Sequence, residues 1–221
     1  MDGVAVLASG GLDSSVLIAD LARETKVFPL YVEKGLVWEA AERRALESFI
    51  RALDNPNVAP TTVLSVPVRD LYGRDHWSLT GQGVPEAGSA DDAVLLPGRN
   101  VLLLSLAAVW CSTHGIERIA LGSLGDNPFP DATPEFFEEL GRLFSKALGK
   151  AVAVTAPYRH LHKADLVRRF SGLPLQHTRT CIAAVEGQAN VHCGACNKCH
   201  ERRAAFAEAG VSDPTAYALA E

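Results

Sequence analysis

The chain has 221 residues, 48% of them hydrophobic and 21% charged, with a formal net charge of -5. This composition is typical of a globular protein with a substantial core, and the negative charge argues against an extensive surface for nucleic acid. The longest apolar stretch, 101–111, is too short to span a bilayer, and the acidic, glycine-containing start lacks the apolar stretch of a secretory signal. We therefore expect a cytoplasmic protein that binds neither a membrane nor nucleic acid directly.

Short apolar runs alternate with stretches of helical periodicity through residues 1–170. The predicted strands are 4–9, 26–32, 61–68, 118–123 and 151–156, and the predicted helices are 14–23, 38–53, 100–114, 134–148 and 163–170. Strands that alternate with helices predict an α/β fold, a Rossmann-like parallel sheet of about five strands with helices on both faces. We expect residues 1–170 to form this domain and residues 171–221 to form a smaller C-terminal segment packed on it.

A glycine-rich stretch, 69–99, interrupts this alternation. A structureless segment of that length inside a compact domain is uncommon, and it is more often a lid or a binding loop than an idle connection. The stretch carries His76 and Trp77, which we expect either to recognise a substrate or an amine donor, or to belong to a surface loop that the tryptophan anchors.

Residues 8–15 (ASGGLDSS) follow the first predicted strand and lead into a helix. Ligands bind at the carboxyl ends of parallel strands, and the start of a helix presents unpaired N–H groups to an anion. Gly10 and Gly11 let the backbone approach a phosphate closely, and Ser9, Ser14 and Ser15 add hydroxyl donors. The alternative is a glycine-rich turn with a serine cap. The stretch has neither the Walker nor the dinucleotide pattern, and it resembles the Ser-Gly-Gly-x-Asp-Ser signature of the PP-loop ATP pyrophosphatases.

Four of the five cysteines lie near the C-terminus, at Cys181, Cys193, Cys196 and Cys199. Thiolates two residues apart can both point at one tetrahedral zinc, and Gly194 frees the backbone to turn between them. Four thiolates close the site, so the spacing predicts a structural zinc ion rather than a catalytic one. Free buried thiols or an iron–sulfur cluster are the alternatives. Cys111, alone in an apolar helix, is expected in the core.

Further segments resemble one family of PP-loop enzymes: 96–100 (LPGRN), 130–137 (PDATPEFF), 161–165 (LHKAD) after Pro157, and 178–181 (TRTC). Together with the cysteine series, they make the chain similar to the 7-cyano-7-deazaguanine synthases over most of its length. The resemblance implies an adenine nucleotide alpha hydrolase-like fold. It also implies an ATP-dependent ligase that converts 7-carboxy-7-deazaguanine and ammonia, through an amide, to 7-cyano-7-deazaguanine in queuosine biosynthesis. By the same analogy we expect a homodimer.

The resemblance implies roles for individual residues. It places the ATP phosphates against Ala8, Ser9, Gly10, Gly11, Leu12, Asp13, Ser14 and Ser15. Asp13 is expected to bind Mg²⁺, or to serve only as a first-turn carboxylate of its helix. Arg99 and Asn100 are expected to contact the nucleotide or the substrate carboxylate, unless Arg99 pairs with Asp91 or Asp92. Lys163 is expected to stabilise negative charge during the reaction, with a solvated first-turn lysine as the alternative.

Two other segments bear on the substrate. Asp126, Asn127 and Asp131 follow the fourth predicted strand, and we expect Asp126 and Asp131 to contact substrate unless they serve only the turn. After the second strand the family has Tyr-Gly-Gln-x-His, whereas this chain has Leu36 and Trp38 at the Gln and His positions. Trp38 is expected either to stack on a purine-like ring or to pack beneath its helix.

Two other functions fit the same residues. A divergent relative would activate the same or a related acid with ATP and transfer it to another amine, such as an amino group of a protein. A non-catalytic module, stabilised by zinc, would bind ATP without turning it over. RNA-modifying PP-loop enzymes are not expected because the chain has no basic extension, and glutamine-dependent synthetases are not expected because a glutaminase domain has no room.

Overall fold

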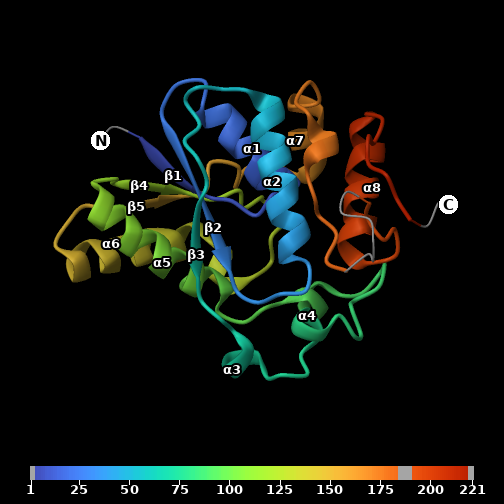
Figure 1. Ribbon diagram of the computed structural model, residues 1–221, viewed down its shortest axis with the longest axis horizontal. Coiled ribbons are helices and arrows are strands. Elements are labelled where there is room, and N and C mark those ends of the chain that lie inside the picture. The colour runs from blue at the N-terminus through green and yellow to red at the C-terminus, as the bar shows by residue number, and fades with distance from the viewer. Residues whose placement is uncertain (1–2, 184–190, 219–221) are drawn as a thin grey trace.

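The computed structural model describes residues 3–183 and 191–218, and its centre is a five-stranded sheet (Figure 1). The strands are β1 (Val4–Leu7), β2 (Val27–Glu33), β3 (Thr62–Ser65), β4 (Arg118–Ala120) and β5 (Ala153–Thr155). They lie in the order β3-β2-β1-β4-β5, and every neighbouring pair is parallel. The predicted Rossmann-like fold is therefore confirmed.

Helices cover both faces of the sheet. On one face lie α1 (Leu12–Leu21), α2 (Glu39–Leu53), α7 (Lys163–Arg169) and α8 (Asn197–Ala209), and on the other lie α5 (Arg99–His114) and α6 (Pro134–Leu148) (Figure 1). Val4 and Val6 of β1 belong to the core cluster of the first face, and Ala5 and Leu7 belong to that of the second. The central strand is thus buried on both sides, as expected in a parallel sheet.

Three strands end earlier than their apolar runs predict. β1 ends at Leu7, β3 at Ser65 and β4 at Ala120, two or three residues before the predicted ends at 9, 68 and 123. Burial and single backbone hydrogen bonds continue past the last regular strand residue: Leu121 lies past β4, is still 7% exposed, and donates its N–H to the Thr155 carbonyl at 3.0 Å. At the ends of β1 and β4, the backbone that leaves the sheet forms the candidate site.

The segment 69–99 carries more structure than its glycines predict. It holds two single-turn helices, α3 (Arg69–Tyr72) and α4 (Trp77–Thr80), and the 3-10 turn η1 (Asp91–Val94). Its apolar side chains pack with Leu36 and Trp38 in a cluster separate from the two sheet faces. In Figure 1, α3 and α4 lie at the bottom, past the end of β3. Two more 3-10 turns, η2 (Pro130–Ala132) and η3 (Leu175–His177), follow later in the chain.

The C-terminal segment shares the core of the sheet domain. Phe206 of α8 belongs to the same buried cluster as Val16 of α1. Arg202 is 1% exposed and donates hydrogen bonds to the Thr178 hydroxyl (2.9 Å), the Leu175 carbonyl (3.1 Å) and the Thr215 hydroxyl (2.6 Å). This buried arginine therefore joins α8 to η3 and to the tail. No helix in the described part of the chain is both long enough and apolar enough to cross a membrane.

Candidate active site

A cavity of about 710 Å³ opens at the carboxyl ends of β1 and β4. These two strands are neighbours, and the helices that follow them, α1 and α6, cover opposite faces of the sheet. This is the switch point at which open α/β sheets bind ligands. The wall of the cavity takes residues from the turn after β1, the loop after β4, and helices α2, α5, α7 and α8.

The stretch 8–15 forms the turn from β1 into α1. Gly10 has a φ of +70°, and a Cβ there would lie 2.3 Å from the carbonyl oxygen of Glu42 in α2, so only glycine fits. The hydroxyls of Ser9 and Ser14 lie 3.2 Å apart, and they accept the backbone N–H groups of Gly11 and Ser9, respectively. No side chain caps α1, so its first N–H groups are available to an anion.

Six of the eight predicted phosphate-binding residues line the cavity: Ala8, Ser9, Gly11, Leu12, Asp13 and Ser14. Gly10 packs under α2, and Ser15 is fully buried with no hydrogen-bond partner for its hydroxyl in the described part of the chain. These two residues shape the turn rather than face the cavity. Sequence reasoning missed Gly122, where a Cβ would lie 2.9 Å from the Asp13 carbonyl oxygen. Its position near the end of the predicted strand 118–123 was the available signal.

Asp13, Lys163, Glu201 and Lys198 form a row of alternating charges on the cavity wall. Lys163 Nζ lies 3.6 Å from Asp13 Oδ2 and 3.5 Å from Glu201 Oε2, and Lys198 Nζ lies 2.5 Å from Glu201 Oε1. Burial alone would lower the pKa of Lys163, but the two carboxylates outweigh it and raise the pKa. Lys163 is thus a charged, ion-paired residue facing the cavity. The Oδ1 atom of Asp13 is buried and has no hydrogen-bond partner among the described residues.

Arg99 begins α5 and also lines the cavity. Within residues 3–183 and 191–218, no ion pair joins it to Asp91 or Asp92, and its positive charge acts instead on Glu42 and Tyr72. Glu42 faces the same space. Burial raises the pKa of Glu42, and the positive charges of Lys34 and Arg99 offset this only in part.

The polar residues predicted to contact substrate are tied to neighbours. Asn100 donates its backbone N–H to Asp131 Oδ2 at 3.0 Å and its side-chain amide to the Asp131 carbonyl at 2.8 Å. Asp126 forms an ion pair with His162, and this contact raises the pKa of the imidazole. The side chain of Asn127 accepts the N–H two residues on, which is turn chemistry. The Asp131 carboxylate thereby caps the start of α5. The cavity is lined by all of these residues: Asn100, Asp126, Asn127, Asp131 and His162.

An aromatic pair forms another part of the wall. The rings of Trp38, just before α2, and Trp77 in α4 are stacked, with centroids 5.6 Å apart and planes inclined by 18°. Trp38 is 5% exposed and packs with Leu36 beneath the segment 69–99. His76 caps α4, because its Nδ1 atom accepts the Ser78 N–H. Among the described residues, His76 is not one of those that line the cavity.

Sequence reasoning missed a buried lysine at the end of β2. Lys34 is 6% exposed, and its ammonium lies 2.9 Å from Glu39 Oε1 and donates to the Val32 carbonyl at 2.6 Å. Next to it, Tyr31 donates to Glu42 Oε2 at 3.0 Å. Lys34, Tyr31 and Glu42 all line the cavity. The available signal was a lysine that directly follows an apolar strand, at the edge of the sheet where ligands bind.

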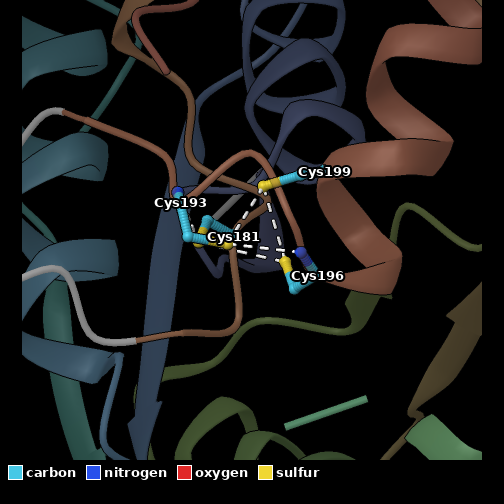
Figure 2. Close-up of side chains that lie close together, drawn as sticks. All are labelled: Cys181, Cys193, Cys196 and Cys199. Atoms are coloured by element: carbon cyan, nitrogen blue, oxygen red, sulfur yellow. Dashed lines mark hydrogen bonds between the residues drawn. The ribbon is translucent and has the colours of Figure 1, made fainter. Parts of the chain in front are cut away.

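The four predicted cysteine ligands converge beside the start of α8. Their sulfur atoms all lie within 4.8 Å of one another, and Figure 2 shows the side chains facing a common centre. Backbone N–H groups of Ala195 and Cys196 donate to the Cys193 sulfur at 3.4 and 3.3 Å. The cluster is therefore consistent with structural zinc. Cys111 lies in the core of α5, as expected.

The segment 69–99 connects this cysteine cluster with the cavity wall. The Ala87 N–H donates to the Ala195 carbonyl and the Asn197 N–H to the Pro85 carbonyl, each at 2.9 Å. The Asn197 side chain donates to the Ser89 carbonyl at 3.0 Å. Backbone donors and acceptors carry no sequence signature, so the sequence could not predict this pairing.

The chain is similar throughout its length to proteins of one family. The family profile described as "Queuosine biosynthesis protein QueC" matches residues 3–210. The chain is 37% identical over 233 residues to the 7-cyano-7-deazaguanine synthase of Xanthomonas campestris pv. campestris (strain B100), with 99% of both chains covered. It is 35% identical over 228 residues to that of Methanothrix thermoacetophila, with 96% of both covered.

A solved structure shares the fold at low sequence identity. The predicted subunit of a tRNA methyltransferase from Methanocaldococcus jannaschii superposes with a TM-score of 0.50 and 13% identity, over 96% of this chain and 90% of the other. This likeness extends to the fold alone, whereas the sequence matches cover nearly every residue. The chain therefore belongs to the QueC family of queuosine biosynthesis proteins.

Proposed function

We propose that this protein is an ATP-dependent carbon–nitrogen ligase that makes 7-cyano-7-deazaguanine from 7-carboxy-7-deazaguanine and ammonia. The observation that carries the proposal is that the predicted phosphate-binding stretch, Lys163, Arg99 and an aromatic pair all line one cavity at the switch point of the sheet. The relatives that match nearly the whole chain are named 7-cyano-7-deazaguanine synthase, and this name supports the proposed reaction.

In this proposal, the turn 8–15 and the start of α1 hold the ATP phosphates. Unpaired N–H groups and the helix dipole favour negative charge there, and Lys163 adds a full positive charge beside them. Asp13 fits a Mg²⁺ ligand because its Oδ1 atom is buried without a hydrogen-bond partner in the described structure, and hard cations prefer carboxylate oxygen. When bound, Mg²⁺ would neutralise charge on the polyphosphate.

Arg99 would hold the carboxylate of the acid while the stacked tryptophans face its ring. A guanidinium matches a carboxylate with two parallel hydrogen bonds, and an aromatic wall suits a purine-like ring. Asn100 and Asp131 would contribute by fixing the first turn of α5, which carries Arg99. Asp126 would contribute at the mouth of the same cavity, next to His162.

The chemistry proceeds in two activations. A carboxylate oxygen of the acid attacks the α-phosphorus of ATP, the bond to the β-phosphate oxygen breaks, and pyrophosphate leaves. Ammonia then attacks the acyl carbon, the C–O bond to AMP breaks, and the nitrogen loses a proton to give the amide. A second ATP activates the amide oxygen in the same way. Loss of that oxygen with AMP, and of both nitrogen protons, leaves the nitrile. The residues of the cavity contribute alignment and charge stabilisation.

We further propose that the cysteine cluster holds one structural zinc ion and that the protein is a cytoplasmic homodimer with no direct nucleic-acid partner. Four thiolates leave no open position on the metal, which suits a structural role. Residues 1–170 would form the ATP-binding domain, with 171–221 packed on it. Elemental analysis should find one zinc per chain, and light scattering after gel filtration should give twice the chain mass.

The experiment that tests the function follows the products by mass spectrometry after incubation with ATP, Mg²⁺, the acid and ammonia. We expect the amide, then the nitrile, with AMP and pyrophosphate. Formation of AMP without amide or nitrile would instead mean that this protein passes the activated acid to another amine. Peptides with free amino groups, added to the same reaction, should then be modified. Absence of ATP–pyrophosphate exchange with the acid would leave a nucleotide-binding module and overturn the proposal.

A further inference from the structure

Helix α8 brings a second lysine, Lys198, to the cavity. Lys198 lies in the first turn of α8, between Cys196, which directly precedes the helix, and Cys199. Lys198 and its neighbour Glu201 line the cavity together with Lys163 and Asp13. The cavity wall therefore receives two charged side chains from the helix that begins at the cysteine cluster. Neither has a role in the activation chemistry described above.

The backbone beneath Lys198 is fixed on both sides. Cys196 and Cys199 are buried, and their sulfur atoms lie 3.4 Å apart within the cluster. Asn197, between Cys196 and Lys198, is bonded through its backbone to Pro85 and through its side chain to Ser89. A long side chain on a backbone held this firmly delivers its charge to a defined place.

Glu201 holds both lysines. Its two carboxylate oxygens lie 2.5 Å from Lys198 Nζ and 3.5 Å from Lys163 Nζ. The side chains of Lys198, Lys163 and Glu201 are 24–29% exposed, so water from the cavity reaches all three. A polyphosphate offers both ammonium groups several anionic oxygens. Glu201 is the carboxylate that competes with it for both lysines, whereas Asp13 contacts Lys163. Lys163 and Lys198 can thus both bind one polyphosphate. When no polyphosphate is bound, Glu201 holds the two ammonium groups in position.

We propose that Lys198 binds the pyrophosphate part of ATP and that Glu201 positions Lys198 and Lys163 while competing with the phosphates for them. This inference rests on the proposed use of ATP. It gives the cysteine cluster a second task besides stability, because the two cysteines that flank Lys198 set where its ammonium lies. Charge-assisted hydrogen bonds from lysine to phosphate are among the stronger polar contacts in proteins.

The test is calorimetric titration of the purified protein with Mg²⁺–pyrophosphate and with MgATP. Lys198→Gln should weaken both affinities about tenfold, the loss of roughly one charge-assisted contact. Glu201→Gln should strengthen both by about threefold, because a competing carboxylate of roughly surface ion-pair strength is removed. The opposite signs separate this role from a structural one, since each substitution breaks the same ion pair. Adenosine, which lacks phosphates, should bind all variants equally.

Lys146→Gln is the matched control because Lys146 is exposed in the last turn of α6, outside the wall of the cavity, and loses the same charge. Zinc content and circular dichroism should be unchanged in every variant. Unaltered pyrophosphate affinity in Lys198→Gln, or weakening in both Lys198→Gln and Glu201→Gln, would overturn the inference. Failure of the unsubstituted protein to bind MgATP would overturn the proposed function instead.

Discussion

Asn100 and Asp131 cap α5 reciprocally. The Asp131 carboxylate accepts the Asn100 backbone N–H at 3.0 Å, and the Asn100 side-chain amide donates to the Asp131 carbonyl at 2.8 Å. Gly98, which precedes the helix, brings no side-chain cap of its own. The contact between η2 and α5 therefore satisfies donors that the start of a helix otherwise leaves unpaired, and it fixes the turn that carries Arg99.

Asp131→Ala should lower the free energy of unfolding by about 1–2 kcal/mol, as for the loss of a helix cap. Asn100→Ala should have a similar effect. Because the two residues share the same contacts, the double variant should lose clearly less than the sum of the single losses. Urea denaturation of the three variants measures this coupling, and strictly additive losses would mean that the reciprocal cap contributes nothing as a pair.

The turn after β1 should tolerate no side chain at Gly10. The positive φ and the 2.3 Å approach of the Glu42 carbonyl oxygen predict that Gly10→Ala destabilises the fold by about 2–4 kcal/mol. It should also weaken MgATP binding, because α2 or the turn must shift. Gly172→Ala is the control, since an added Cβ there meets nothing within 4 Å. A Gly10→Ala protein as stable as Gly172→Ala would contradict this account.

The cysteine cluster should hold the segment 69–99 as well as α8. Removal of the zinc ion proposed for this cluster, or Cys199→Ser, should lower the unfolding temperature and speed hydrogen exchange at the Ala87 N–H, which donates to the Ala195 carbonyl between Cys193 and Cys196. Cys111→Ala, a change in the core of α5, should retain full metal content. Elemental analysis and exchange mass spectrometry measure both effects. Unchanged protection at Ala87 in the metal-free protein would separate the segment from the cluster.

Local motifs were predictable from the sequence, and long-range backbone contacts were not. The turn 8–15 and the four cysteines depend on residue types at fixed short spacing, so their geometry follows from a few neighbouring side chains. The pairing of Ala87 with Ala195 joins two backbones more than a hundred residues apart, and alanine carries no sign of it. Burial of Lys34 was equally hidden, because it depends on Glu39 folding back over the end of β2.

Roles of single polar residues were harder to predict than their location. Arg99, Asn100, Asp126, Asp131 and Lys163 all line the predicted edge of the sheet. Their partners come from elements distant in sequence, such as His162 for Asp126 and Glu201 for Lys163. Strand order and helix packing decide which side chains meet. Patterns in a single sequence do not predict either feature accurately enough to name the partner residues.

The ion pair of His162 with Asp126 should make stability depend on pH near neutrality. The hydrogen bond and charge of Asp126 raise the pKa of His162 above its ordinary 6.5. The resulting stabilisation should be fully present below the pKa that His162 has in the unfolded chain. It should be lost as the pH rises through the higher pKa of His162 in the folded protein. NMR titration of the imidazole in the folded and the urea-unfolded protein measures both values. Asp126→Asn should make the folded and unfolded pKa values of His162 nearly equal. Equal values in the unsubstituted protein would mean that this ion pair does not make stability depend on pH. Because His162 immediately precedes α7, the same titration reports on the start of the helix that carries Lys163 to the cavity.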